Sequence, residues 1–521
     1  MAPYDGAACA LIEYMARTSL PRICIALGFP DAEKLLEHAR REIEAGESFF
    51  EFRLDYLADP ERGVEAIRRL MELHPECTIL ATCRRHQNHG KFNGSIEEHI
   101  RILDDAVRAG AKAVDVEIES AENVAAKLDL FRGRALLVLS YHNYEGTPAL
   151  DAVFRRMVRV GADAYKVVTT ARKPSDNYRV LALAKSNPRV PLVMLAMGEA
   201  GLATRVLGTS WGALYTYAAP NCSEGTASGQ VSARQLRHLY RVEKFSRTAK
   251  IYGVIADPVR HSISPAVHNR AFQARRVDAV YLPFLVKPQQ LKDFFALGDQ
   301  LPIAGFSVTI PHKQKVLRYL DIIDPLSRRI GAVNTVWKKA GKWRGTNTDA
   351  EAVTGSLARH VRLAKSSVLL AGNGGAARSA AFALADAGAK VTLVGRNPDR
   401  VRALAKICGA ESMLREQVDS HHFDVFLHAT PLGMYPKTDE SFFEGRIPAD
   451  VVFDMVYNPL DTALLRHASK QGKTVVRGIE MFLAQATRQF EIWTGESAPR
   501  SAMDKAALES LGQRSAEAVQ E

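Results

Sequence analysis

The sequence predicts an α/β protein in two parts: an N-terminal (β/α)8 TIM barrel, followed by a two-lobed α/β region with a Rossmann nucleotide-binding domain. Three observations lead to this prediction. Short apolar runs alternate with amphipathic helical stretches from residue 22 to about residue 245. The pattern changes near "EKFSRTAK", residues 243–250. Further on, a glycine-rich turn at residues 372–375 stands between an apolar run and a helical stretch.

The apolar runs of the first part are the predicted barrel strands. There are eight, at residues 22–27, 49–55, 78–83, 111–118, 135–142, 164–170, 191–198 and 212–219. Eight strand–helix repeats in about 225 residues fit a TIM barrel, which carries its catalytic side chains at the C-terminal ends of the strands. An open doubly wound sheet is the alternative, but this part shows no glycine-rich phosphate turn.

The remaining chain divides into two further predicted domains. We assign residues 20–245 to the barrel, residues 250–350 with a helical segment at about 480–515 to a substrate-binding domain, and residues 351–480 to the Rossmann domain. The last assignment depends on the strand "SVLLAG" (367–372), the turn and helix that follow it, and the strand "KVTLVGR" (390–396). The polar tail from residue 498 is expected to fray.

Composition limits the possible partners and compartment. The 521 residues carry a net charge of +11, which favours anionic partners. Because there is no long basic run and no basic helix with interleaved aromatics, small carboxylates or phosphates are favoured over nucleic acid. The six cysteines form no CxxC pair, which indicates a reducing compartment, and we expect a cytoplasmic protein. No apolar run approaches about 18 residues and no signal peptide is evident, so we expect no membrane span.

Lys166 interrupts the apolar run "AYKVVTT" in the sixth predicted strand. Apolar neighbours would favour its neutral amine, which forms a Schiff base with a ketone. His142, at the end of the fifth strand, is the candidate base, and Arg84 and Arg205 are candidates to bind a substrate carboxylate. Glu51 would orient the histidine or an arginine. The set indicates proton abstraction next to an imine, as in a dehydratase or an aldolase, with an ion-paired lysine and a core histidine as the alternatives.

Six motifs of the first part resemble type I 3-dehydroquinate dehydratase. They are "EFRLDYL" (51–57), "ATCR" (81–84), "SYHNY" (140–144), "AYKV" (164–167), "MGEAGLATRVLG" (197–208) and "ASGQVS" (227–232). The resemblance implies that Lys166 forms the Schiff base and that His142 is the general acid/base. The substrate would be lined by Glu51, Arg53, Arg84, Arg205, Gln230 and Thr226, the last in place of a serine. The chain departs from the family at Asn88, where a glutamate would help to poise the histidine, and at His89, where a glycine is usual.

The glycine-rich turn predicts a dinucleotide site. Its glycines follow a strand and open a helix, so the backbone can approach a pyrophosphate at the helix N-terminus. An NAD site would place an acidic residue at the end of the next strand, to hold the ribose hydroxyl. This chain instead has Arg396 there and Arg400 one helical turn later, which favours NADPH over NADH.

Seven motifs of the second part resemble shikimate dehydrogenase: "SISP" (262–265), "FSVTIPHK" (306–313), "GAVNTV" (331–336), "GTNTDA" (345–350), "ATPLGM" (429–434), "DMVYNP" (454–459) and "GIEMFLAQA" (478–486). The resemblance implies a catalytic pair, Lys313 and Asp349, that protonates the developing alkoxide. The implied substrate-binding residues are Ser262, Ser264, Thr309, Asn334, Tyr457 and Gln485. The implied NADP-binding residues are Gly372, Asn373, Gly374, Gly375, Ala376, Arg396, Asn397, Arg400, Thr430, Met434 and Gly478.

Together the two resemblances indicate a fused dehydratase–dehydrogenase of the shikimate pathway. The barrel would convert 3-dehydroquinate to 3-dehydroshikimate, and the second part would reduce that product to shikimate. Two alternatives stay open: a second part that acts on quinate, and a regulatory protein that senses these metabolites without the chemistry. No metal is expected, and the sequence does not give the oligomeric state.

Overall fold

The computed structural model describes residues 20–221 and 225–520, and its main division into two compact units falls between Ala249 and Lys250. Of the six cysteines, Cys24, Cys77, Cys83 and Cys408 are free and buried, as expected, while Cys9 and Cys222 lie outside the described residues. Within the described residues no helix is long and apolar enough to cross a bilayer, and no three His, Cys, Asp or Glu side chains are grouped to hold a metal ion.

The first unit is a parallel eight-stranded barrel, so the TIM-barrel prediction is confirmed and the open-sheet alternative is wrong. The hydrogen-bonded order runs β7-β6-β5-β4-β3-β2-β1-β8, and an isolated parallel bridge between Leu192 and Ala213 joins the two ends. The strands are β1 Ile23–Leu27, β2 Phe49–Arg53, β3 Thr78–Thr82, β4 Ala113–Glu117, β5 Leu136–His142, β6 Ala164–Thr170, β7 Leu192–Met197 and β8 Thr216–Ala218.

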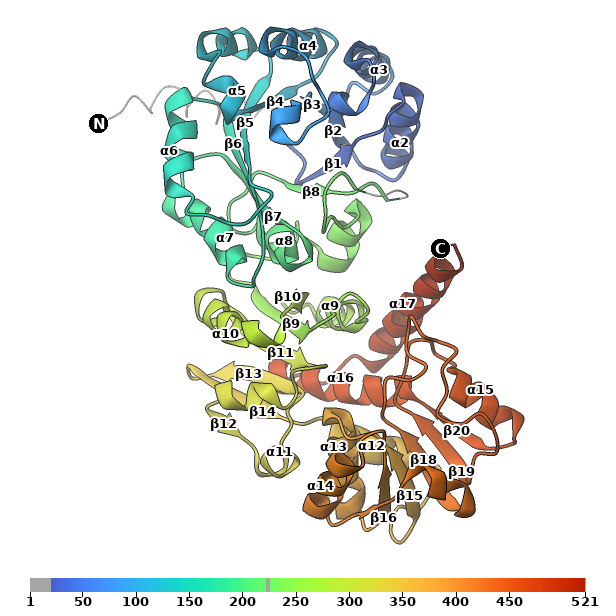
Figure 1. Ribbon diagram of the computed structural model, residues 1–521. Helices are drawn as coiled ribbons and strands as arrows, with labels where there is room; N and C mark the ends of the chain where they lie inside the picture. The colour runs from blue at the N-terminus through green and yellow to red at the C-terminus, as the bar shows by residue number, and fades with distance from the viewer. Residues whose placement is uncertain (1–19, 222–224, 521) are drawn as a thin grey trace. The chain divides into compact units, whose positions relative to one another are not determined.

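Helices surround the barrel strands (Figure 1). Two of them begin at well-formed caps: the Asp31 side chain accepts from the backbone of Glu33 and Lys34, and Ser95 forms a capping box with Glu98. The helices are α2 Ala32–Glu44, α3 Pro60–Leu73, α4 Ile96–Arg108, α5 Ile118–Ala121, α6 Asp151–Val160, α7 Asp176–Ser186 and α8 Leu202–Leu207.

The interior of the barrel changes from apolar to polar along the strands. Because successive side chains point to opposite faces of a strand, every second residue enters the interior. One layer is apolar and includes Phe49, Leu80, Ala113, Val138 and Ala164. Two residues further along the same strands, or at the equivalent level of β8, stand six buried polar side chains: Glu51, Thr82, Asp115, Ser140, Lys166 and Tyr217. We call these six residues the Lys166 cluster.

The second unit contains two six-stranded sheets (Figure 1). The first sheet has the order β10-β9-β11-β13-β14-β12 and is mixed, since β13 pairs antiparallel with β11 and with β14. Its strands are β9 Lys250–Ala256, β10 Ala279–Leu285, β11 Ile303–Val308, β12 Ile322–Ile323, β13 Thr335–Lys339 and β14 Lys342–Thr346. Its helices are α9 Ser264–Arg275, α10 Leu291–Gln300 and α11 Pro325–Ile330.

The second sheet is parallel throughout, in the order β17-β16-β15-β18-β19-β20 that defines a Rossmann domain. The strand order reverses between β15 and β18, and ligands of such sheets bind at that crevice. The strands are β15 Ser367–Ala371, β16 Lys390–Val394, β17 Glu411–Ser412, β18 Phe423–His428, β19 Ala449–Asp454 and β20 Thr474–Arg477. The helices are α12 Asp349–Leu357, α13 Gly375–Asp386, α14 Pro398–Cys408 and α15 Ala463–Lys470.

Two C-terminal helices pack against the first of these two sheets. Helix α16, Gly478–Thr494, begins at the end of β20, and its Trp493 side chain donates to the Val336 carbonyl on β13 at 3.1 Å. Helix α17, Arg500–Gln520, packs Met503, Ala507 and Leu511 into the same core as α9. The expectation that the tail frays from residue 498 is therefore wrong, because these apolar residues, four apart, form one face of a helix.

Candidate active sites

Lys166 lies at the centre of a hydrogen-bonded cluster inside the barrel. Its Nζ donates to Asp115 Oδ2 at 2.8 Å, to Glu51 Oε1 at 3.1 Å and to the Tyr217 hydroxyl at 2.8 Å. Thr82 donates to Glu51 Oε1 at 2.9 Å, and Ser140 donates to Asp115 Oδ1 at 2.6 Å. Only 4% of the Lys166 side chain is exposed, so protein groups supply its entire polar environment.

This arrangement corrects one expectation and narrows another. The side chains next to the Lys166 amine are two carboxylates and a phenol, not apolar residues, so the amine lies in a buried ion pair. Glu51 was expected to orient the histidine or an arginine; in the described structure it contacts Lys166, and its charge also acts on Arg53. The sequence predicted apolar surroundings because Val167 and Val168 are the neighbours of Lys166 along the strand. The side chains that contact its amine come from other strands.

His142, at the C-terminal end of β5, is held as a neutral base. Burial first, and then the nearby cations Arg84, Lys166 and Arg53, lower the pKa of His142 well below its usual value. Its Nδ1 is buried and has no hydrogen-bond partner in the described part of the chain. Asn88 donates to Glu119 Oε2 at 2.9 Å, so within the described contacts its side chain does not replace a carboxylate on the histidine.

Three arginines lie at the same end of the barrel and differ in their hydrogen-bond and ion-pair partners. Arg53 is held by Asp55 through two hydrogen bonds of 2.8 Å, which engage the guanidinium that was expected to bind substrate. Arg84 donates to the Tyr144 hydroxyl at 3.3 Å and lies 3.6 Å from Glu117. Arg205, on α8, is completely buried and has no carboxylate partner among the described residues.

The loop at residues 225–230 lies beside Gly28, which follows β1, and Gly198, which follows β7. A Cβ built on Gly28, just after β1, would lie 2.9 Å from the Thr226 methyl group. Gln230 accepts from the backbone of Ala227 at 3.2 Å, which fixes its side chain within this loop. Both predicted residues therefore lie near the C-terminal ends of the strands, where the substrate is expected.

In the second unit, Lys313 and Asp349 form the pair that the sequence predicts. Lys313 Nζ donates to Asp349 Oδ2 at 2.5 Å, and Asn334 Nδ2 donates to Asp349 Oδ1 at 2.7 Å. Gln485 Oε1, on α16, lies 3.5 Å from the same Asn334 nitrogen. Asn334 was expected to bind substrate, and the structure shows that it also fixes the carboxylate that holds the lysine.

The other predicted substrate residues lie on segments around this pair. Ser262 accepts from the Ser264 backbone at 3.2 Å at the start of α9, and Ser264 also hydrogen-bonds the buried Tyr281. Thr309 follows β11 on the loop that leads to Lys313. Tyr457 packs on α16, with its ring centroid 4.7 Å from that of Phe482.

In the glycine turn between β15 and α13, the backbone lies so close to neighbouring segments that a side chain would not fit at Gly372 or Gly375. Gly372 has φ +128°, and a Cβ there would lie 2.9 Å from the Ala429 carbonyl oxygen at the end of β18. A Cβ on Gly375 would lie 2.9 Å from Lys313 Cβ. Lys313 therefore packs directly on the turn that carries Asn373, Gly374 and Ala376.

The remaining predicted nucleotide residues surround the switch point. Arg396 and Arg400 are exposed after β16 and form no ion pair among the described residues, while the Asn397 side chain caps α14. Thr430 and Met434 lie on the loop after β18, where Met434 is 42% exposed, and Gly478 is the first residue of α16.

Four buried groups in these sites were not singled out from the sequence. Asp115 and Tyr217 contact Lys166. His428 Nδ1 lies 2.9 Å from Asp454 Oδ1, and its Nε2 contacts the Thr430 hydroxyl. A signal existed for Asp115 and for His428: each is a buried polar residue in a mostly apolar strand.

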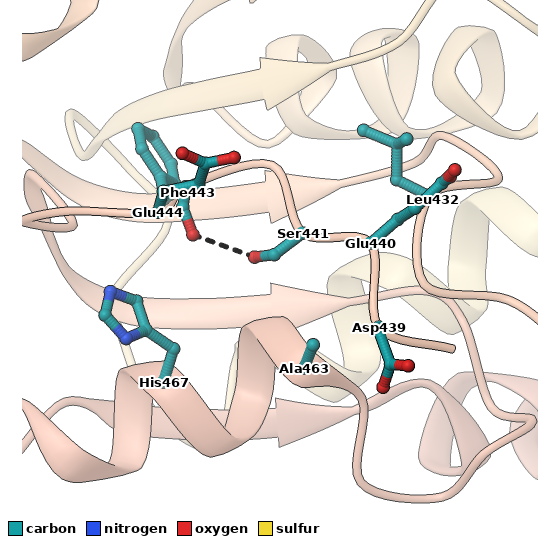
Figure 2. A pocket seen from close by; sticks show the side chains of 8 residues that line it. All are labelled: Leu432, Asp439, Glu440, Ser441, Phe443, Glu444, Ala463 and His467. Atoms are coloured by element: carbon teal, nitrogen blue, oxygen red, sulfur yellow. Dashed lines mark hydrogen bonds between the residues drawn. The ribbon is translucent and has the colours of Figure 1, made fainter. Parts of the chain in front are cut away.

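A hollow of about 640 Å³ lies on the Rossmann domain, and neither lysine lines it (Figure 2). Its lining residues are Leu432, Asp439, Glu440, Ser441, Phe443, Glu444, Ala463 and His467. None is a predicted site residue, and three carboxylates disfavour a phosphate-bearing ligand.

Comparisons with known proteins agree with both halves. Residues 23–246 match the family model of type I 3-dehydroquinase, residues 254–336 the shikimate dehydrogenase substrate-binding domain, and residues 478–508 the shikimate 5'-dehydrogenase C-terminal domain. The bifunctional 3-dehydroquinate dehydratase/shikimate dehydrogenase of Arabidopsis thaliana chloroplasts is 33% identical over 503 residues, which cover 92% of this chain and 83% of that protein. The shikimate dehydrogenase (NADP(+)) of Methanosarcina acetivorans is 40% identical, over 50% of this chain and 99% of its own length. A solved shikimate dehydrogenase in complex with NADP+ covers 51% of this chain and 97% of its own at 35% identity, with a TM-score of 0.49.

The barrel with its buried lysine and the two-lobed unit with its Rossmann sheet define a two-enzyme chain, a lyase joined to an oxidoreductase. The chain belongs to the family of bifunctional 3-dehydroquinate dehydratases/shikimate dehydrogenases, as the sequence motifs indicated.

Proposed function

We propose that the barrel dehydrates 3-dehydroquinate through a Schiff base on Lys166. The amine adds to the ketone, and loss of water gives an iminium that acidifies the neighbouring C–H bond. Neutral His142 takes that proton and then returns it to the leaving hydroxyl group. Hydrolysis of the imine releases 3-dehydroshikimate. The Lys166 cluster and the neutral, unpaired Nδ1 of His142 support these roles.

The observation that carries this proposal is the state of Arg205. Its Nε and Nη2 are buried with no hydrogen-bond partner among the described residues. Burial lowers the pKa of Arg205 to about 10, so the guanidinium is still charged at neutral pH. A buried, unpaired cation is costly unless an anion joins it. The barrel is therefore organised to receive an anionic substrate, and the carboxylate of 3-dehydroquinate fits.

The second unit, in the same proposal, reduces 3-dehydroshikimate to shikimate with NADPH. The glycine turn leaves room for a pyrophosphate, and the unpaired Arg396 and Arg400 suit a 2′-phosphate. The nicotinamide supplies the hydride when it is bound. Lys313 donates a proton to the carbonyl oxygen, and Asp349, held by Asn334, keeps the lysine in place.

This proposal also assigns the domains and the compartment. Residues 20–245 form the dehydratase, residues 250–350 with 480–515 bind the shikimate ring, and residues 351–480 bind NADP. The four free, buried cysteines fit a cytoplasmic enzyme. A purely regulatory role is not favoured, because both lysine-centred clusters are fully formed.

A coupled assay tests the whole proposal. With 3-dehydroquinate and NADPH, we expect continuous loss of nicotinamide absorbance, and a rate with NADH that is lower by roughly tenfold or more, because the arginines favour the 2′-phosphate. Direct addition of 3-dehydroshikimate separates the two steps. If 3-dehydroshikimate is reduced and 3-dehydroquinate is not consumed, the dehydratase assignment is wrong; the reverse result rejects the dehydrogenase.

Replacement of Arg205 is expected to change substrate binding and stability in opposite directions. Arg205→Met should raise KM for 3-dehydroquinate roughly 10- to 100-fold, since a hydrogen-bonded charge contact is lost. It should also raise the free energy of unfolding by about 1–3 kcal/mol, because an unpaired buried charge is removed. Steady-state kinetics and chemical denaturation measure the two effects. Arg205→Lys, which keeps the charge, is the control with an intermediate KM, and a Met variant that is less stable would contradict the unpaired state.

A further inference from the structure

Lys166 must lose a proton before it can act as a nucleophile. Its Nζ donates to three acceptors, Asp115, Glu51 and Tyr217, at 2.8–3.1 Å, which is the full complement of an ammonium group. An ammonium has no lone pair. The proton must therefore pass to a group that touches Nζ, because the lysine is only 3% exposed and water does not surround it.

Asp115 is the acceptor best placed to take this proton. Its Oδ2 has Lys166 Nζ as its hydrogen-bond partner, at 2.8 Å, while its Oδ1 accepts from Ser140. Glu51 Oε1 lies further from Nζ, at 3.1 Å, and already accepts from Thr82 and Tyr217 as well. Tyr217 donates its own proton to Glu51.

The electrostatics of Asp115 suit a reversible transfer. Burial opposes its charge, but the Lys166 and Arg84 cations outweigh burial and hold the pKa of Asp115 below its usual value. The resting residue is thus a carboxylate. Once the proton leaves Lys166, the attraction between its cation and the carboxylate, which is stronger than that of Arg84, disappears. Burial then favours the neutral acid. Amine and acid then form a neutral pair inside the barrel.

His142 does not supply this step. At rest it is neutral, because burial and neighbouring cations lower its pKa. A neutral imidazole with no partner on Nδ1 has capacity to take the C–H proton later. It holds no spare proton for the water that leaves while the imine forms.

We infer that Asp115 is the acid and base of imine formation, a role separate from the carbon chemistry of His142; this rests on the proposed dehydratase function. Asp115 Oδ2 takes a proton from Lys166 Nζ, and the nitrogen lone pair forms a C–N bond as the carbonyl π pair moves to oxygen. An N–H proton moves to that oxygen to give the carbinolamine. Asp115 then protonates the hydroxyl, the C–O bond breaks, water leaves, and the nitrogen lone pair completes the iminium. The carboxylate is restored.

The test is the rate at which borohydride traps 3-dehydroquinate on Lys166, followed by mass spectrometry in single-turnover experiments on the full chain. Asp115→Asn keeps the shape but takes no proton, and should lower the trapping rate at least about 100-fold. The primary isotope effect for substrate deuterated at the reacting C–H should fall to about 1, because imine formation becomes limiting.

His142→Ala should keep trapping within a few-fold while dehydration is lost. Equal trapping by wild type and Asp115→Asn overturns the inference, and no trapping by wild type overturns the proposed function instead.

A second variant guards against a misfolded barrel. Ser140→Ala removes the 2.6 Å hydrogen bond to Asp115 Oδ1, so the carboxylate should protonate more readily. The acid limb of the trapping-rate profile should then move to higher pH. Circular dichroism and chemical denaturation of the variant, compared with wild type, report whether the barrel is folded, and shikimate oxidation by the same chain reports the amount of intact second unit. An acid limb that does not move would assign Asp115 a purely structural role.

Discussion

Replacement of Lys166 by methionine is expected to abolish dehydration, by about a thousandfold or more, and to leave shikimate oxidation unchanged. The methionine side chain fills similar space but cannot form an imine, so the covalent route is closed. The two activities reside in separate compact units, and the second therefore serves as an internal control for expression and folding. Both rates are measured on one preparation of the full chain.

The same substitution should destabilise the barrel. Lys166→Met leaves Asp115 and Glu51 buried without their cation, and loss of one partner from a buried ion pair costs about 3–5 kcal/mol. The loss should shrink as the pH falls, because a protonated carboxyl group needs no cation. Lys166→Arg is the matched variant: it keeps a charge and lacks the nucleophile, so activity is lost with a smaller change in stability. Dehydration that persists in either variant would remove Lys166 from the mechanism.

Much of the fold follows from short-range patterns. The eight apolar runs predicted the eight strands within a few residues. Both faces of a barrel strand are covered, one by the barrel interior and one by the helices, so the strand is a nearly continuous apolar run. The glycine turn predicted the Rossmann crossover, since the close approach of Gly372 to Ala429 permits no side chain. The C-terminal helix was harder, because its apolar residues are sparse and its partner, α9, lies more than 200 residues earlier.

The environment of Lys166 could not be predicted from its own strand. Glu51 and Asp115 come from β2 and β4, which are 115 and 51 residues away in the chain. Their contact depends on barrel closure and on register, and neither is encoded in the run "AYKVVTT". For Lys313 and Asp349, 36 residues apart, family motifs supplied the pairing that spacing alone did not. The sequence could not show that Arg205 Nε and Nη2 have no hydrogen-bond partner among the described residues, because this depends on the side chains that surround them in the fold.

Replacement of Lys313 is expected to lower kcat for shikimate oxidation by about 10²- to 10⁴-fold, with a change in KM of only a few-fold. Lys313→Met removes the group that exchanges a proton with the reacting oxygen. Asp349 stays in place because Asn334 still donates to it at 2.7 Å, so the unit should fold normally. Steady-state kinetics with saturating NADP+ measure both constants.

Two variants separate chemistry from position. Asp349→Asn keeps Lys313 but removes the carboxylate that holds its Nζ at 2.5 Å, so kcat should fall while KM changes little. Lys315→Met, an exposed neighbour two residues along the same loop, should leave kcat and KM unchanged. If Lys313→Met instead raises KM and leaves kcat intact, the lysine binds the substrate without moving a proton. The alkyl chain of Lys313 packs on Gly375, so the lysine lies beside the turn that we propose binds the dinucleotide.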